Sequence, residues 1–555
     1  METPVELLRQ GKTKELWLMC CSFIDLTLDQ FMGIQKRLLL EQIELLNRSG
    51  IGRRAMQGAE PSTVEEFREQ VPLTTYANYC PYLQERREYD LPARVDRWVK
   101  TSGYSGTYDV KWVPWSERFT QECEKVAAAC AMLALSRWRG DTSQLKPHLK
   151  ILYTVGGPDY ASGAIGYLMQ RAIDYDFLPS GADALPFTER IKAGFAQALD
   201  QGLDAFGGLP SVLVTVGDQM REQPKRPDAN FLRAHPRAAL RLAKGLAKSR
   251  LAGRQMMPKD LWDIKGILGG GTDSAVFKKK VEEMWGKKPL ELYAGTEGGI
   301  YAVQTWDYAG MTFIPNLNFF EFIPEDEHLK WRADPSYQPR TVLLNEVKAE
   351  NNYEVVITNL HGGALVRFRL GDMVRMVSLR NEYSDIDLPQ MVFYARADYV
   401  IDIAGLGRLT ERIIWEALEN TGVPYVDWTA RKEIWGDRVV LHLYIEPKPS
   451  HCLVEADIAA SFARELRKLD ERYHHNPYSI YDSAPGTEAE ANSSQVEVTL
   501  LPRGVFADYV ARRQAEGADL GHLKPPHINP SEKALALLSI NMTQPATVGG
   551  TSIDR

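Results

Sequence analysis

A run of hydroxyl and glycine residues between positions 101 and 107 has the composition of an anion-binding loop. The segment reads Thr-Ser-Gly-Tyr-Ser-Gly-Thr, and a lysine follows at position 111. Such a loop brings backbone N–H groups and hydroxyls close to phosphate oxygens, and a lysine adds a mobile positive charge. A surface turn could have the same composition, and the chain contains no Walker or dinucleotide glycine motif. The candidate phosphate-binding residues are Ser102, Gly103, Ser105, Gly106, Thr107 and Lys111.

A second candidate motif joins a glycine run to a strand and a turn. The run Gly-Gly-Gly-Thr-Asp precedes an expected helix, after which Leu290–Glu297 ends in Tyr-Ala-Gly-Thr-Glu. Gly270 and Gly271 would let the backbone lie flat on one face of a purine, and Tyr293 could cover the other face. Glu297 offers a hard oxygen ligand for Mg²⁺, which keeps few protein ligands. A plain glycine turn and a core tyrosine are the alternatives, but the order of the two parts favours a nucleotide site.

A third motif, Arg-Phe-Arg-Leu-Gly-Asp, ends in the carboxylate of Asp372. A carboxylate can accept two hydrogen bonds from the paired hydroxyls of a ribose. Arg396, some two dozen residues later, could reach the same sugar or a phosphate. Alone, this motif would be an ordinary exit from a strand. Because it follows the other two, we predict one nucleotide pocket with a phosphate loop, a purine and metal wall, and a ribose-binding carboxylate.

The elements that must position these residues are those of an α/β protein. Residues 1–80 have helical periodicity, with a helix start at Ser62 or Thr63. From 100 to 395, short β-rich runs alternate with helical ones, and we expect strands at 149–155, 211–216 and 353–358. Strands alternating with helices predict sheets layered by helices, with ligands at the strand ends.

A smaller α+β domain is expected to begin near Ala395. Its predicted elements are helices at 409–419 and 454–469 and strands at 439–446 and 496–500. Residues 484–495 are rich in small and acidic residues, which predicts a surface loop. The expected organisation is therefore a large domain at 1–395, a small mobile domain at 396–540 and a disordered tail at 541–555.

Composition limits the class of protein. The chain has 555 residues and a net charge of −7, which argues against a protein dominated by nucleic-acid contacts. Six cysteines without metal spacing, no secretory signal and no apolar run long enough to span a bilayer indicate a cytoplasmic enzyme. We expect neither nucleic acid nor membrane as a partner.

One segment departs from this balance. Residues 233–254 are strongly basic and helical in pattern. They could form a helix that binds nucleic acid or a membrane surface, or simply a solvated helix face. The acidic balance elsewhere favours the solvated face.

The order of the motifs resembles the auxin-responsive acyl-acid amido synthetase family, a branch of the adenylate-forming superfamily that includes acyl-CoA synthetases and firefly luciferase. The resemblance covers roughly residues 30 to 530, and its specificity comes from the order of six segments. These are Phe320–Pro324, Asn345–Val347, Tyr353–Thr358, Arg367–Val374, Leu501–Phe506 and Gly521–Pro526.

The resemblance implies a two-step reaction. A carboxylic acid attacks the α-phosphate of Mg²⁺-bound ATP to give an acyl-adenylate, and an amine, often an amino acid, then takes the acyl group and releases AMP. In this family Ser102, Ser105 and Thr107 would hold phosphates, Thr296 would contact the α-phosphate region, Glu297 the metal and Asp372 the ribose, and Lys524 would reach the acid and phosphate oxygens. The small domain would swing between half-reactions about a hinge at Asp398.

The chain also departs from the family pattern. Tyr104 replaces a small hydroxyl residue in the phosphate loop, and one extra residue precedes Lys111, so the roles of neighbouring loop residues could shift by one. Residues 156–167, which resemble the helix that lines the acyl pocket, could either leave room for a ring or pack tightly. Two other functions therefore stay open, a thioester synthetase acting on coenzyme A or a carrier protein, and an inactive nucleotide-binding protein. The identities of the acid and the amine, and the oligomeric state, are not encoded in any motif.

Overall fold

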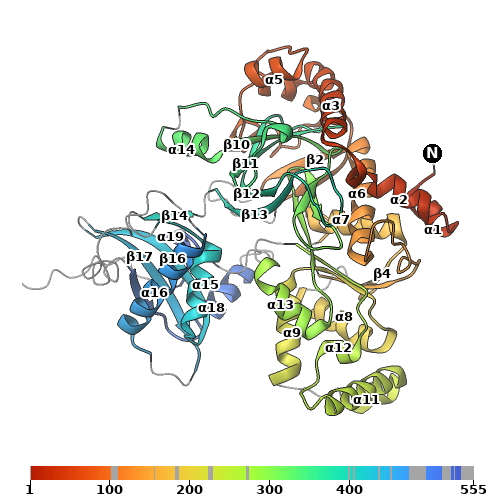
Figure 1. Ribbon diagram of the computed structural model, residues 1–555, viewed down its shortest axis with the longest axis vertical. Helices are drawn as coiled ribbons and strands as arrows, with labels where there is room; N and C mark the ends of the chain where they lie inside the picture. The colour runs from red at the N-terminus through yellow and green to blue at the C-terminus, as the bar shows by residue number, and fades with distance from the viewer. Residues whose placement is uncertain are drawn as a thin grey trace, which may run out of the picture. The chain divides into compact units, whose positions relative to one another are not determined.

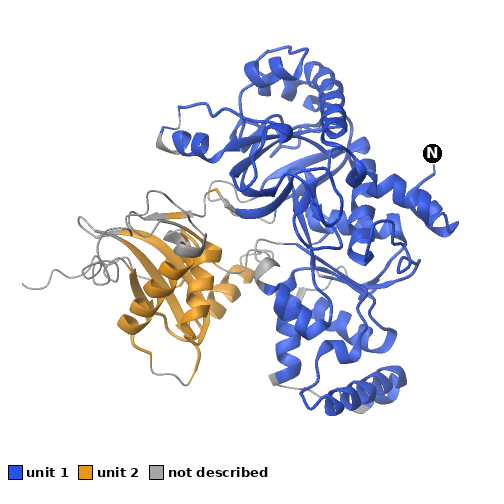
Figure 2. Cartoon of the chain, viewed as in Figure 1, with its two compact units in different colours: residues 1–102, 110–394 blue, residues 103–109, 395–555 orange. Residues whose placement is uncertain are grey.

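The computed structural model describes most of the chain in two compact units. Residues 1–102 and 110–394 belong to the first unit, and residues 395–555 to the second (Figure 2). The described residues are 2–101, 110–154, 157–181, 187–222, 229–270, 274–334, 336–397, 400–403, 407–435, 438–449, 453–473, 496–515, 525, 527–530 and 532–538. Five site candidates of the phosphate loop, together with Gly271 and Lys524, lie outside these ranges, as do the expected loop at 484–495 and the tail at 541–555.

The first unit begins with a helical segment, as the periodicity predicts (Figure 1). Thr63 caps a helix by accepting a hydrogen bond from the backbone N–H of Glu66 at 3.1 Å. The longest of these helices buries Phe31, Leu38 and Ile43. The helices are α1 Pro4–Arg9, α2 Thr13–Cys21, α3 Leu28–Arg48, α4 Gly50–Ala55 and α5 Val64–Gln70.

Eleven described strands of the first unit form one sheet in the order β10-β11-β12-β13-β9-β8-β7-β6-β5-β3-β4. The parallel end consists of β3 Lys150–Thr154, β4 Asp176–Leu178, β5 Ala205–Gly208, β6 Gly266–Gly269 and β7 Leu290–Gly295. The remaining strands are β8 Gly299–Gln304, β9 Met311–Phe313, β10 Asn318–Pro324, β11 Asn352–Asn359, β12 Phe368–Ser378 and β13 Gln390–Arg396. A separate hairpin pairs β1 Val95–Lys100 with β2 Trp112–Ser116.

Helices cover both faces of the parallel strands, which confirms the α/β class. One apolar core packs α8 Phe187–Gln201, α9 Pro210–Glu222, α12 Pro258–Leu261 and α13 Ser274–Trp285 on one face. On the other face, α6 Glu117–Leu135 contacts β6 and β8 and packs against α7 Ala161–Ile173. The other helices of this unit are α10 Ala229–Ala234, α11 Pro236–Leu251 and α14 Glu325–Ala333. Among the described residues, no helix combines the length and apolar character needed to cross a bilayer.

One expected strand is wrong. Residues 211–216 form part of α9, although Ser-Val-Leu-Val-Thr-Val is rich in β-branched residues. Pro210 occupies the start of the helix, where its missing N–H costs nothing. Leu213 and Val214 are buried, and the indole Nε1 of Trp285 in α13 donates to the Leu213 carbonyl at 2.9 Å. Packing against α13 has therefore overridden the strand preference of β-branched residues.

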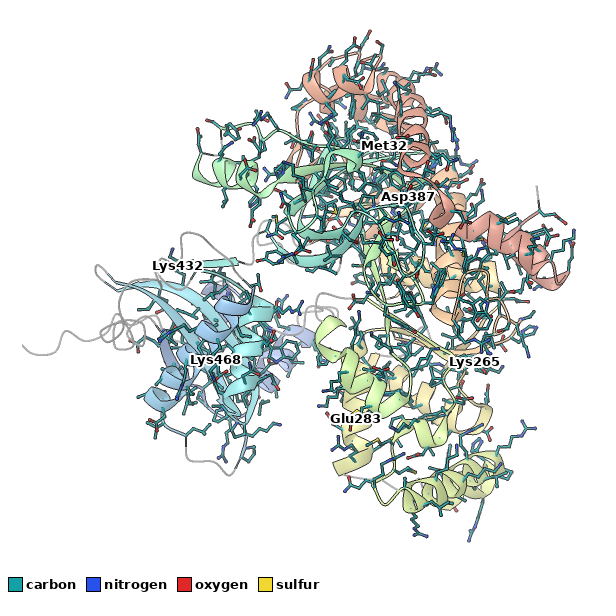
Figure 3. All side chains as sticks on the ribbon, viewed as in Figure 1. Met32, Lys265, Glu283, Asp387, Lys432 and Lys468 are labelled. Atoms are coloured by element: carbon teal, nitrogen blue, oxygen red, sulfur yellow. The ribbon has the colours of Figure 1, made fainter. Side chains whose placement is uncertain are left out.

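The polarity of the parallel strands defines where a ligand would bind. At their amino ends, Asp204 accepts from Lys265 Nζ at 2.6 Å and from the Lys150 backbone N–H at 2.9 Å, which joins β3, β5 and β6; Lys265 is labelled in Figure 3. At the opposite edge, Thr154, Gly208 and Gly269 stand in register at the carboxyl ends of the same strands. Ligands of α/β sheets bind beyond carboxyl ends, so the candidate site is expected at this edge.

The second unit is a small α+β unit built on a three-stranded sheet, in the order β16-β17-β18. Its elements are β14 Val400–Ile403, β15 Gly407–Thr410, α15 Glu411–Thr421, β16 Tyr425–Trp435, β17 Arg438–Pro447, α16 Glu455–Tyr473, β18 Val496–Leu500, α18 Val505–Ala515 and α19 Glu532–Leu537. The helices α15 and α16 bury one face of this sheet, while α18 and α19 pack near Tyr444 on the other.

Candidate nucleotide site

The turn between β7 and β8 carries two predicted site residues, Thr296 and Glu297, both half-buried. Its shape depends on glycine. A Cβ on Gly295 would lie 2.8 Å from the hydroxyl of Tyr301, and one on Gly298 would lie 2.5 Å from the same ring. Gly299, the first residue of β8, has φ +71°, which other residues rarely adopt. The glycines thus allow a tight turn that presents Thr296 and Glu297 at the end of β7.

Neighbouring side chains hold the backbone of this turn. Asn359 Nδ2 donates to the Glu297 carbonyl at 2.8 Å, and Asn318 Nδ2 donates to the Gly298 carbonyl at 2.8 Å. The two asparagines also bond to each other at 2.9 Å, and both are buried. These bonds satisfy backbone carbonyls and so fix the turn. The orientation of the Glu297 side chain then follows from the shape of the turn.

A third contact ties the turn to the hairpin that leads into the predicted phosphate loop. The indole Nε1 of Trp115, in β2, donates to the Thr296 carbonyl at 3.3 Å. At the other end of β2, Thr101 and Lys111 close the hairpin, since Thr101 N donates to the Lys111 carbonyl at 2.9 Å and Lys111 N donates to Thr101 Oγ1 at 3.1 Å. Lys111 Nζ lies 5.6 Å from the ring centre of Tyr76. Both ends of the predicted loop are therefore anchored.

Asp372 lies on a bulge of β12. Arg369 pairs with Val356 and Met373 pairs with Glu354, so Leu370, Gly371 and Asp372 together face one residue of β11. Gly371 takes φ +70° within this bulge. A bulge of this kind bends the strand and re-aims a side chain. The aimed side chain is the buried carboxylate of Asp372.

The carboxylate of Asp372 meets Tyr293 of β7. Tyr293 donates its hydroxyl proton to Asp372 Oδ2 at 2.8 Å, and both side chains are buried. The Tyr293 ring also packs against Tyr301 at 4.7 Å and against Phe393 of β13 at 6.1 Å between ring centres. Three strands lie between β7 and β12 in the sheet order. At about 4.8 Å per strand, only a strongly curled sheet can bring these two side chains into contact.

Gly270 completes the described part of the site at the adjacent strand end. It follows β6, and its backbone N–H donates to the Gly208 carbonyl at 3.2 Å. A Cβ placed on Gly270 would meet no described atom within 4 Å. That the backbone here faces a flat base stays a prediction of the glycine run. Arg396 ends β13.

The structure places Gly270 after β6, Tyr293, Thr296 and Glu297 on β7 and its turn, and Asp372 on the β12 bulge, where it contacts Tyr293. These groups are chemically compatible with a nucleotide, since a carboxylate can accept hydrogen bonds from the paired hydroxyls of a ribose. Among the described residues, no group of three or more His, Cys, Asp or Glu side chains forms a metal site. A divalent cation here would rely on Glu297 together with phosphate oxygens and water.

Three residues that hold the site had no signal in the sequence. Asn318 and Asn359 stand at the ends of strands, and Trp115 lies in β2. Asparagine at a strand end is common, so the residue type predicts only a turn. It does not predict a hydrogen bond to another asparagine 41 residues away. Only the pairing of β10 with β11, which sets Asn318 opposite Asn359, shows that they act together.

Comparisons with known proteins identify two parts of the chain. The model of the GH3 family N-terminal domain matches residues 20–170, which include the hairpin of β1 and β2. The model of the GH3 family central domain matches residues 311–396, which include the bulge that carries Asp372.

Among characterised relatives, jasmonoyl–L-amino acid synthetase JAR6 of Nicotiana attenuata is 23% identical over 549 residues, covering 86% of this chain and 88% of the relative. Jasmonoyl–L-amino acid synthetase JAR4 of the same plant is 26% identical over 51% of this chain and 47% of its own length. The 4-substituted benzoates-glutamate ligase GH3.12 of Arabidopsis thaliana is 27% identical over 41% of this chain and 38% of its own length. The aligned part thus spans less than half of the last two relatives.

Solved structures show the same fold. The AtGH3.15 acyl acid amido synthetase in complex with 2,4-DB superposes with a TM-score of 0.63 at 17% identity, covering 94% of this chain and 95% of that one. An open conformation of 2-hydroxyisobutyryl-CoA ligase, in complex with 2-HIB-AMP and CoA, gives 0.51 at 16% identity, covering 86% and 89%. Two domain models of the GH3 family thus match the stretches on either side of the β7–β8 turn, and the chain shares its fold with a solved acyl acid amido synthetase.

Proposed function

We propose that the protein is an ATP-dependent ligase that activates a carboxylic acid as an acyl-adenylate and transfers the acyl group to an amine, often an amino acid, to form an amide. The observation that carries this proposal is the contact between Tyr293 and Asp372 beside the Thr296–Glu297 turn. The named activities of the GH3 relatives, which join acids to amino acids, support the choice of reaction.

Each residue has a defined task in this proposal. The carboxylate of Asp372, oriented by the Tyr293 hydroxyl, accepts hydrogen bonds from the ribose hydroxyls. Gly270 and Gly271 face the base, and Arg396 reaches the sugar or a phosphate. Ser102, Gly103, Ser105, Gly106, Thr107 and Lys111 bind the phosphates of ATP.

The remaining tasks concern charge at the reacting phosphate. Thr296 contacts the α-phosphate region, and Lys524, in the small domain at 396–540, neutralises the acid and phosphate oxygens during adenylation. Glu297 would hold Mg²⁺, which neutralises phosphate charge when bound. The protein otherwise contributes positioning and fixed charges, which is sufficient for this class of phosphate chemistry. We place the enzyme in the cytoplasm.

Acid-dependent exchange of pyrophosphate into ATP tests the first half-reaction. We expect exchange with at least one member of a panel of aromatic, fatty and amino acids. Absence of exchange with the whole panel, despite ATP binding, would instead favour the inactive nucleotide-binding protein. Product mass spectrometry in the presence of mixed amines then identifies the amide.

The rival acceptor is a thiol. The match of the fold to a CoA ligase is the observation that supports this alternative. Release of AMP should be stimulated by amines and not by coenzyme A. Stimulation by coenzyme A alone, with a thioester as product, would overturn the amide assignment while leaving the adenylation step intact.

A further inference from the structure

The helix α11 lies at the edge of the first unit, in its lower part in Figure 1. It packs through small residues, since Ala238, Gly245 and Ser249 are its buried positions. A Cβ added to Gly245 would lie 2.6 Å from the Leu261 side chain of α12, so this face sits close against its neighbours. The helix therefore attaches by a narrow face and leaves the opposite one exposed.

That opposite face is apolar along its centre. Leu240 is 57% exposed and Leu251 is 89% exposed. Ala243 and Ala247, which are also exposed, complete a stripe with spacings of three, four and four residues. Such spacing places all four side chains on one side of a helix. At 1.5 Å per residue the stripe, from Leu240 to Leu251, is about 16 Å long.

Exposed cations flank this stripe. Arg237, Lys244, Lys248 and Arg250 are exposed, and none of them forms an ion pair with the part of the chain that the structure describes. Two other arginines of the same segment are used inside the protein. Arg241 donates to the Ala198 carbonyl at 3.2 Å, and Arg254 forms two bonds with Asp260 at 2.7 and 2.8 Å. The cations are thus divided into an inward set with partners and an outward set that faces solvent.

The local charge is opposite to that of the protein. Residues 229–259 contain no aspartate or glutamate, whereas the whole chain carries a net charge of −7. A single exposed leucine needs no explanation on a soluble protein. Two leucines and two alanines in one stripe, bordered by cations in a segment without acidic residues of its own, match the pattern of helices that lie in a membrane interface.

The apolar centre of the stripe favours a lipid surface as the partner over a nucleic acid or a second copy of the chain. A nucleic-acid backbone would use the cations but leave the leucines in water. A second copy of the chain would bring the two cationic borders together, and like charges facing each other destabilise an interface. An anionic lipid surface satisfies both parts, because its headgroups attract the cations and its acyl boundary accepts the leucines.

We propose that the face of α11 formed by Leu240, Ala243, Ala247 and Leu251, with its bordering cations, docks on an anionic lipid surface. This surface contains none of the candidate nucleotide-site residues. The inference differs from the expectation drawn from the sequence, in which a solvated face was favoured, because the sequence could not show that the leucines point away from the protein.

Sedimentation of the full-length protein with vesicles tests the proposal. We expect binding to phosphatidylcholine vesicles containing phosphatidylserine, about tenfold weaker binding to phosphatidylcholine alone, and weakening as salt is raised. Replacing Lys244 and Lys248 by glutamine should lower partitioning into anionic vesicles by about fivefold per cation. Replacing Leu240 and Leu251 by glutamate should reduce binding to the level seen with neutral vesicles.

A matched control separates this face from a general effect of added charge. Leu18 and Leu379 are 53% and 51% exposed on other elements, so Leu18→Glu with Leu379→Glu makes the same chemical change elsewhere. The control should bind anionic vesicles as the unmodified protein does. Absence of binding to anionic vesicles, or equal loss in both leucine pairs, would overturn the proposal. Salt-sensitive binding to DNA or to an acidic protein that resists the Leu240 and Leu251 changes would also overturn it.

Discussion

The hydroxyl of Tyr293 bonds to the carboxylate of Asp372 at 2.8 Å, although 79 residues separate them along the chain. Tyr293 comes from a strand of the parallel half of the sheet, and Asp372 from a bulge in the antiparallel half. One hydrogen bond therefore joins the two halves beneath the candidate nucleotide site, and its removal should affect ATP binding as well as stability.

Tyr293→Phe is the mildest test of this bond. Phenylalanine keeps the ring packed against Tyr301 and Phe393 but removes the donor. We expect the free energy of unfolding to fall by about 1–2 kcal/mol, since a buried carboxylate oxygen loses a partner. The KM for ATP should rise by roughly three- to tenfold if the phenol orients Asp372. A thermal melt and ATP-dependent exchange kinetics measure the two effects, and an unchanged KM would limit Tyr293 to a structural role.

Asp372→Ala should weaken ATP binding more strongly than Tyr293→Phe. The ribose diol loses its acceptor, and the Tyr293 hydroxyl loses the partner seen at 2.8 Å. A loss of about 1.5–3 kcal/mol in binding, as for hydrogen bonds to a charged group, corresponds to roughly 10- to 150-fold. Calorimetric titration with ATP and with 2′,3′-dideoxy-ATP distinguishes the site. The variant should bind both nucleotides equally, whereas a preference for ATP that survives the change would remove Asp372 from the ribose contact.

Glu297→Gln should abolish adenylation and spare the fold. The backbone carbonyl of Glu297 still accepts from Asn359, so the turn keeps its shape. Loss of the carboxylate should lower pyrophosphate exchange by at least about 100-fold, because a metal or phosphate contact is lost where charge is neutralised. The melting temperature should stay within about 2 °C. Full exchange activity in this variant would rule out the metal role of Glu297.

His527 predicts a pH dependence of stability in the second unit. Burial alone would lower the pKa of His527, but its hydrogen bonds to Asp427 at 2.8 Å and to Glu411 at 2.6 Å outweigh burial and raise the pKa to about 10. The ordinary value is 6.5. The stabilisation from the charged imidazole is fully present below about pH 6.5 and is lost as pH rises toward 10.

Calorimetric melts of the full chain between pH 6 and pH 10 measure this effect. Within that window the slope should approach roughly 1.4 kcal/mol per pH unit. His527→Gln should lower stability at pH 6 and flatten the slope. A slope that survives the change unaltered would mean that His527 does not carry it.

The sequence predicted some secondary-structure elements well and one of them wrongly. Strands 149–155 and 353–358 were correct within a residue or two, because short runs rich in β-branched and aromatic residues favour strands. Residues 211–216 are equally rich in β-branched residues yet form a helix, in which Leu213 and Val214 pack in one core with α13. Local pattern cannot weigh that tertiary choice.

The candidate site shows the same division. Glycine, threonine and glutamate at 295–297 predict a turn that carries functional side chains. Glycine favours a tight turn, and glutamate offers an oxygen ligand for a metal. The bond between Tyr293 and Asp372 has no local signal, because it depends on how far the sheet curls between β7 and β12. The sequence therefore named Tyr293 and Asp372 as candidates without predicting the contact between them.

The bulge of β12 sets residues 370–372 opposite the single residue Val355 of β11, an excess of two, as the pairs Arg369–Val356 and Met373–Glu354 show. Two is an even number, so residues on both sides of the insertion keep the same inward and outward alternation, and only the inserted segment changes direction. A single-residue deletion there would invert the whole downstream strand, exchanging its buried and exposed faces. Substitutions around Asp372 should thus be tolerated far better than insertions or deletions, because the number of residues in the bulge sets the direction of its side chains.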